Sequence, residues 1–178
     1  ECARSYETIM ESFLALQTGL DPRLLAGLKA DILKDRALFQ KVLHHERRMY
    51  REDTDLLDLN IRTLEKCGAH LETMLRALNS EQDQGYEILM APELRQLSSA
   101  TVNGMRAIAS GGVPDQATIS LALENAEIRL RELRDEGATK RFHLQKLVQF
   151  FAFYHSAHSM GRDILLYGLN ARFDIARP

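Results

Sequence analysis

The chain has 178 residues, of which 45% are hydrophobic and 27% charged, with a formal net charge of −2. This length and apolar content suit a single domain with one core, and the near-neutral charge gives no electrostatic case for binding nucleic acid. Gly and Pro are scarce, with 10 and 4 residues, which favours a few long helices over many short strands.

Apolar residues recur at three- and four-residue steps along most of the chain, a spacing that predicts helices and no strand. Asp21-Pro22 marks a helix start, since Asp caps a helix N-terminus and Pro suits its first position. Residues 110–115 form the clearest linker. The pattern predicts an all-α fold, a single antiparallel bundle of about five to seven helices. The expected helices cover residues 3–18, 22–50, 54–79, 92–110, 115–136 and 139–168.

The apolar signal is weakest between His44 and Asp58. The second helix either breaks in this stretch or continues as one long exposed rod. We expect a break near Asp53 and Thr54, because a compact bundle needs the chain to reverse its direction there.

The last predicted helix carries five consecutive residues, 150–154, of which four are aromatic. Successive helical residues point about 100° apart, so these rings cannot all line one pocket. We expect some to pack between helices, with Leu147, Phe151, Tyr154, His158 and Leu165 on one face. The candidate residues for an interface or a pocket on this helix are Phe151, Tyr154, His155 and His158.

Two pairs of potential metal ligands have helical spacing, Cys67-x-x-His70 and His155-x-x-His158. Together they would suit zinc, but amphipathic side chains at the edge of an apolar stripe are the favoured interpretation. No histidine follows a Glu at the spacing of di-iron carboxylate bundles. No phosphate loop, nucleophile elbow or dinucleotide fingerprint is present. We therefore expect no metal, no cofactor and no enzymatic activity.

Arg47, Arg48 and Arg51 form the densest basic cluster. They are candidate contacts for an anionic small molecule or for anionic lipid headgroups. The alternative is a solvated helix surface, because Glu52 and Asp55 follow two of these arginines at the four-residue spacing of helical ion pairs. The second interpretation is the stronger one.

Two cysteines are too few for a disulfide scaffold and favour a reducing compartment. No segment approaches the roughly 20 apolar residues that span a bilayer. The chain also starts at Glu1 without an initiating Met, and its helical pattern continues almost to the last residue. We expect it to be a domain of a longer polypeptide.

Several short motifs occur in a fixed order along the chain. They are Cys2-Ala3-x-x-Tyr6, Gly19-Leu20-Asp21-Pro22, Leu38-Phe39, Arg47-Arg48, Leu57-x-Leu59-Asn60 and Arg172-Phe173-Asp174. This order of motifs resembles the soluble region of the fusaric acid resistance family, the aromatic acid exporters of bacterial inner membranes. One departure is His44-His45-Glu46, where the family often has an acidic Phe-Glu-Asp-like element.

The resemblance implies a helical domain on the cytoplasmic side of the inner membrane, between two transmembrane halves of the same polypeptide. Those halves would export aromatic carboxylic acids or related toxic organic anions. The domain would brace them and mediate subunit contact or substrate entry. Partners implied are the transmembrane halves, a second copy of the chain and a periplasmic adaptor protein. Two other classes stay open: a helical adaptor or regulatory domain of a signalling protein, and a metal-binding sensor bundle.

Overall fold

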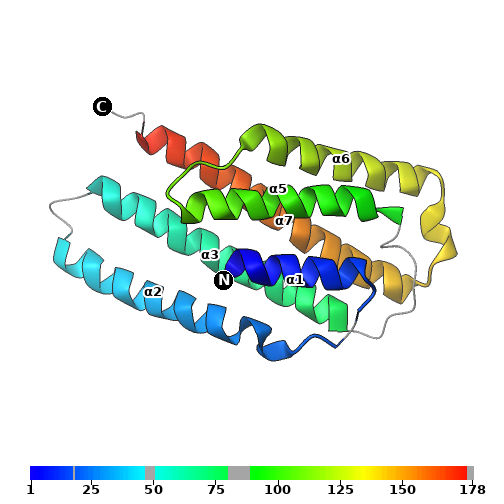
Figure 1. Ribbon diagram of the computed structural model, residues 1–178, viewed down its shortest axis with the longest axis horizontal. Helices are drawn as coiled ribbons and strands as arrows, with labels where there is room; N and C mark the ends of the chain where they lie inside the picture. The colour runs from blue at the N-terminus through cyan, green and yellow to red at the C-terminus, as the bar shows by residue number, and fades with distance from the viewer. Residues whose placement is uncertain (18, 47–50, 80–88, 176–178) are drawn as a thin grey trace.

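The computed structural model describes residues 1–17, 19–46, 51–79 and 89–175, and their side chains except those of 42–46, 51–54 and 171–175. These residues form helices and no strand, which confirms the predicted all-α bundle. Consecutive helices run in opposite directions (Figure 1). None of the described helices is long and apolar enough to span a membrane. The elements are α1 (Cys2–Leu14), η1 (Pro22–Leu25), α2 (Ala26–Glu46), α3 (Arg51–Asn79), α5 (Ala91–Ala109), α6 (Gln116–Asp135), η2 (Ala138–Arg141) and α7 (Leu144–Ile175).

Several predicted boundaries are wrong. Helix α1 ends at Leu14 rather than at residue 18, and α7 continues to Ile175 rather than ending at residue 168. A break near Asp53 and Thr54 does not occur, because α3 begins at Arg51 and runs through both residues. The two helices are nevertheless separate, since α2 ends at Glu46. The last helix begins at Leu144 rather than at residue 139, because a 3₁₀ turn follows Gly137, whose φ of 71° ends α6.

The centre of the bundle is the pair α3 and α7, which share the most extensive interface. Helices α1, α5 and α6 pack around this pair, and α2 packs against α3. The core holds large apolar side chains from all six of the described α-helices, so hydrophobic burial is the main stabilising force. In its middle the ring of Phe13 from α1 stacks on the ring of Phe153 from α7, with centroids 3.6 Å apart and planes 7° apart.

The buried face of α7 differs from the predicted one. Tyr154 is buried as expected, but Leu147, Phe151, His158 and Leu165 are only partly buried. The reason is that α7 contacts α3, α5 and α6 and also meets α1 through Phe153, so its core face is wide and is centred elsewhere. That face carries Phe150, Phe153, Tyr154, Ala157, Met160 and Ile164.

Gly104 allows α5 to come close to its neighbours. A Cβ atom at this position would lie 2.7 Å from Cγ2 of Ile164 and 2.9 Å from Cδ1 of Ile119. Since these residues belong to α7 and α6, the missing side chain sets how closely three helices approach each other.

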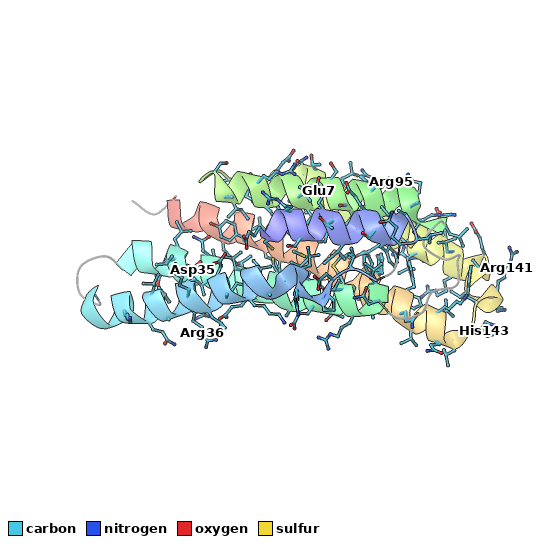
Figure 2. The ribbon with its side chains drawn as sticks, turned by 60° about the horizontal axis from the view of Figure 1, so that its bottom comes forward. Glu7, Asp35, Arg36, Arg95, Arg141 and His143 are labelled. Atoms are coloured by element: carbon cyan, nitrogen blue, oxygen red, sulfur yellow. The ribbon has the colours of Figure 1, made fainter. Side chains whose placement is uncertain are left out.

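Helix α2 packs against α3 with Leu28 and Phe39 buried. Ion pairs at the surface add to this contact: Lys29 pairs with Glu72 of α3, and Nη1 of Arg36 lies 3.1 Å from Oε1 of Glu65. The outer face of α2 includes Leu33, which is 67% exposed, and the neighbouring pair Asp35 and Arg36, labelled in Figure 2. Because surface ion pairs contribute little, the buried apolar side chains make the larger contribution to holding α2 on the bundle.

Candidate functional site

A pocket of about 410 Å³ lies between α6 and α7, a volume in the range typical of small-molecule sites. It brings together the four residues that the sequence singles out on the last helix. Helix α6 supplies four more, which the sequence analysis did not identify. The lining residues are Phe151, Tyr154, His155 and His158 of α7, with Glu127, Leu130, Arg131 and Arg134 of α6.

The position of the α6 residues follows from the apolar stripe of that helix. Leu123, Ala126 and Leu133 are buried against the core. Residues 127, 131 and 134 follow each other at four- and three-residue steps, so they form one row beside the stripe. This row faces α7, the next long helix in the chain, which runs antiparallel to α6 (Figure 1). The spacing beside the stripe is the signal that could have revealed them.

One wall of the pocket consists of aromatic rings. The ring of Phe151 stacks on that of His155, with centroids 6.0 Å apart and planes 27° apart. The ring of Tyr154 lies 5.7 Å from that of His158. The ring pair of Phe151 and His155 offers an aromatic face against which another ring can pack.

The hydroxyl of Tyr154 is the unusual group in the pocket. The side chain is 2% exposed, and its oxygen has no hydrogen-bond partner among the described residues. Burial, and secondarily the charge of Glu127, raises the pKa of Tyr154 to about 12, so the hydroxyl keeps its proton. Buried polar groups are nearly always paired, because leaving one unpaired costs about 1–3 kcal/mol. A residue that lines the pocket therefore carries a hydrogen-bond donor that is unused among the described residues.

His158 and Glu127 meet across the pocket. Nε2 of His158 lies 2.9 Å from Oε1 of Glu127, without the alignment of a good hydrogen bond. Burial lowers the pKa of His158, and the carboxylate of Glu127 opposes this shift only in part. The imidazole is therefore neutral at pH 7.

Two guanidinium groups stand at the exposed edge of the pocket. Nε of Arg134 lies 3.7 Å from Oδ1 of Asp135, whereas Arg131 makes no ion pair within the described part of the chain. With Glu127 as the one carboxylate in the lining, the fixed charge of the pocket is positive. Guanidinium groups bind carboxylates through two parallel hydrogen bonds. The pocket thus combines an aromatic wall, a buried donor and a cationic edge, which suits a small aromatic anion.

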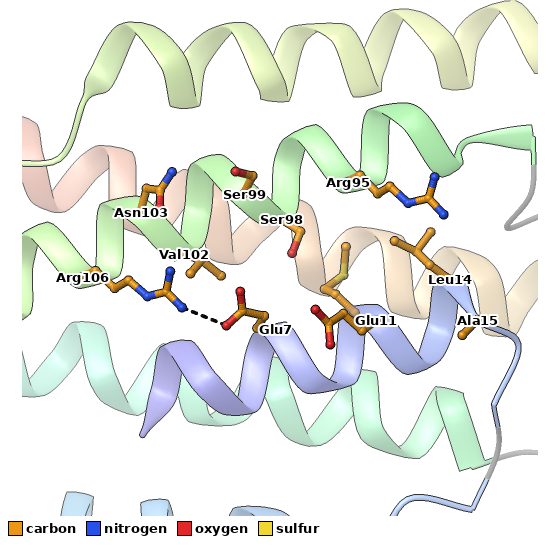
Figure 3. A pocket seen from close by; sticks show the side chains of 11 residues that line it. Glu7, Glu11, Leu14, Ala15, Arg95, Ser98, Ser99, Val102, Asn103 and Arg106 are labelled. Carbon is orange, nitrogen blue, oxygen red and sulfur yellow. Dashed lines mark hydrogen bonds and ion pairs between the residues drawn. The ribbon is translucent and has the colours of Figure 1, made fainter.

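A second groove, between α1 and α5, has a volume of about 360 Å³ and a balanced set of charges (Figure 3). It contains two arginines, Arg95 and Arg106, and two glutamates, Glu7 and Glu11. Nη2 of Arg106 lies 2.9 Å from Oε2 of Glu7, so part of this charge is already neutralised. None of its described side chains has a buried polar atom without a partner, which makes it the weaker candidate.

The two potential metal-ligand pairs face different partners. Nε2 of His70 lies 3.2 Å from Oδ2 of Asp163, and Cys67 contacts Cys2. His158 contacts Glu127 instead. Among the described residues, no three His, Cys, Asp or Glu side chains are grouped as metal ligands would be.

The basic cluster predicted as an anion or lipid contact falls outside the described side chains. Arg47 and Arg48 belong to residues that the structure does not describe, and Arg51 is described only as part of the helical backbone of α3. Their proposed role remains a prediction.

The chain matches no family model, no curated protein and no solved structure. Functional inference therefore depends on the chemistry of the α6–α7 pocket and on the motifs in the sequence.

Proposed function

We propose that the α6–α7 pocket binds a small aromatic carboxylate, and that the chain is a cytoplasmic domain of an inner-membrane exporter of such anions. The observation that carries this proposal is the buried, unpartnered hydroxyl of Tyr154 in a pocket that also contains Arg131 and Arg134. The exporter role is the one implied by the resemblance to the fusaric acid resistance family.

Each part of an aromatic carboxylate has a counterpart in the pocket. Its ring stacks on the surface formed by Phe151 and His155. Its carboxylate accepts hydrogen bonds from the guanidinium groups of Arg131 and Arg134 at the edge. The hydroxyl of Tyr154 donates a further hydrogen bond, which it does not make in the free protein. Binding thus pairs a polar group that is otherwise buried alone.

The second part of the proposal concerns how the pocket is connected to transport. Half of the pocket lies on α7, a continuous helix of 32 residues that packs along α3. A helix of this length is about 48 Å long. Its last turns contain Arg172-Phe173-Asp174, the motif that in the family precedes the second transmembrane half. In this role α7 holds the pocket at a constant position relative to that half, while the bundle braces both halves.

Export measured in cells tests the proposal. The gene that encodes this chain is expressed in a strain lacking its own copy, with Arg131 and Arg134 both changed to Gln. Benzoate efflux is expected to fall about tenfold, because the loss of about 1.4 kcal/mol of binding corresponds to that factor. The matched control is Arg95→Gln on α5, outside the pocket. Normal efflux by the double variant, at wild-type protein level, contradicts the proposal.

The reading frame around the segment separates the two parts of the proposal. Apolar spans of about 20 residues encoded before Glu1 and after Pro178 support the exporter role. A kinase, receiver or DNA-binding neighbour contradicts it and favours a ligand-sensing regulatory domain, in which the pocket keeps its ligand but not its role in transport.

A further inference from the structure

The two cysteines of the chain lie together in another part of the bundle. Cys2 is in the first turn of α1 and Cys67 is in α3, and these two helices pack against each other. Both side chains line a pocket of about 710 Å³, to which α2, α5 and α7 also contribute. Cys67 is 1% exposed, whereas Cys2 is only partly buried. Cys67 is therefore the more deeply buried member of the pair, and Cys2 the less buried one.

The two thiols lie in the same wall of this pocket, on helices that pack together. Hydrogen bonding with Cys67 is the main cause that lowers the pKa of Cys2. The same bond raises the pKa of Cys67, as does its burial. Cys2, the less buried of the two residues, therefore loses its proton at a lower pH than Cys67 does. A thiolate is the nucleophilic form of cysteine, so Cys2 is the reactive member of the pair.

We propose that Cys2 and Cys67 form a peroxide-oxidisable thiol pair, in which Cys2 attacks the peroxide and Cys67 resolves the product to a reversible disulfide between α1 and α3. The geometry that supports this is the placement of a partly buried and a more deeply buried thiol on two packed helices beside an open pocket. Reactive redox cysteines commonly have this arrangement, an accessible thiolate next to a resolving thiol.

The chemistry balances in two steps. The sulfur of Cys2 attacks one oxygen of hydrogen peroxide, so that an S–O bond forms, the O–O bond breaks and hydroxide leaves and takes up a proton as water. The sulfur of Cys67 then attacks that of Cys2, so that the S–S bond forms and the S–O bond breaks, and a second water leaves with the proton of Cys67. The two thiols lose two electrons and peroxide gains them. An external dithiol returns the pair to its reduced form.

The disulfide would change the wall of the large pocket. In the reduced protein α1 is held on α3 by packing of its buried side chains, including Tyr6 and Ile9. A covalent link at the first turn of α1 fastens the end of the helix where the pocket lies. The oxidation state of the pair thereby controls how freely this wall moves.

Peroxide treatment of the reduced, purified chain tests the inference by intact mass and peptide mapping. The expected product is a monomer about 2 Da lighter, with both thiols lost and with the peptides of Cys2 and Cys67 joined, and dithiothreitol reverses the change. In Cys67→Ser the sulfenic acid on Cys2 persists and is trapped by dimedone. In Cys2→Ser, Cys67 reacts at least about tenfold more slowly because it is buried and protonated.

Two results overturn the inference. One is oxidation of Cys2 to sulfinic acid in the wild-type chain while Cys67 remains a free thiol. The other is a dimer linked through Cys2 of two chains. Both results come from the wild-type protein, so the test stays decisive if either variant fails to fold. Circular dichroism of the variants before oxidation checks their fold.

Discussion

Single residues determine the chemistry of the α6–α7 pocket, and Tyr154 matters most. Its hydroxyl is buried and unpartnered within the described residues, a state that costs stability. The rest of its ring packs in the core beside Phe150, with centroids 6.0 Å apart. A phenylalanine at this position would provide the same ring for packing in the core. The hydroxyl is the group that the proposed ligand would pair.

Removing this hydroxyl is expected to have opposite effects on stability and binding. Tyr154→Phe should raise the free energy of unfolding by about 1 kcal/mol, since an unpaired buried donor disappears. The same change should weaken benzoate binding about fivefold or more, because a hydrogen bond to the anion is lost. Urea unfolding and calorimetry measure the two quantities. The matched control is Tyr167→Phe on the same helix, outside this pocket, which should leave binding unchanged.

A stability loss equal to that of an ordinary buried hydrogen bond would contradict this account of Tyr154, because it would show that the hydroxyl is paired in the free protein.

His158 gives the protein a stability that depends on pH. Burial lowers the pKa of His158 in the folded state below its usual value of 6.5, so the unfolded chain binds the proton more readily. Stability should therefore fall as the pH decreases through about 6.5 toward 5. Thermal unfolding at pH 7 and pH 5 measures the difference, which His158→Gln should reduce. The control His155→Gln, which replaces an exposed imidazole in the same pocket, should keep it. Equal pH dependence in His158→Gln and the wild type would argue against this role.

At the scale of elements, the close packing of α5, α6 and α7 holds the two walls of the candidate site together. Helix α5 does not line the pocket, but it contacts both helices that do. Gly104 makes this contact possible, because any side chain there would meet Ile164 and Ile119.

A larger residue at this glycine is expected to destabilise the bundle. Gly104→Val should lower the free energy of unfolding by about 2 kcal/mol, since overpacking a core forces side chains and backbone to shift. The control is Gly27→Ala in α2, where the nearest atom to the new methyl group is Oε2 of Glu1 at 3.5 Å. That variant should be more stable by about 0.5–1 kcal/mol, because alanine favours helix over glycine. Urea unfolding of both variants checks the pair of predictions, which fails if Gly104→Val is as stable as the wild type.

At the scale of the whole molecule, periodicity predicts the fold because each helix must bury one apolar face. In α1 and α6 the apolar residues at helical spacing are the buried ones, with Tyr6, Ile9 and Met10 in α1 and Ile119 and Leu123 in α6. The buried face of α7 differs from the predicted one, because a helix surrounded by several others buries a wider arc than one apolar row indicates. The break between α2 and α3 was misplaced because the polar sequence around Asp53 is also that of an exposed helix.

The pocket is only half predictable for a similar reason. The sequence alone indicates the α7 half of the pocket, because aromatic and histidine residues lie close together on one predicted helix. These residues are Phe151, Tyr154, His155 and His158. Arg131 and Arg134 look like ordinary surface residues until the structure places α6 beside α7. The Tyr154 hydroxyl lacks a hydrogen-bond partner because of how all the neighbouring side chains are placed. The spacing of residues along the sequence does not predict that placement.

The central claim is that the α6–α7 pocket binds an aromatic carboxylate, and a benzoate titration of the purified chain followed by two-dimensional amide NMR tests it most directly. We predict saturable shifts centred on residues 127–134 and 151–158, with an affinity reduced about tenfold in the double variant Arg131→Gln and Arg134→Gln. Absence of saturation up to about 10 mM benzoate, or shifts centred instead on the groove between α1 and α5, would contradict the claim.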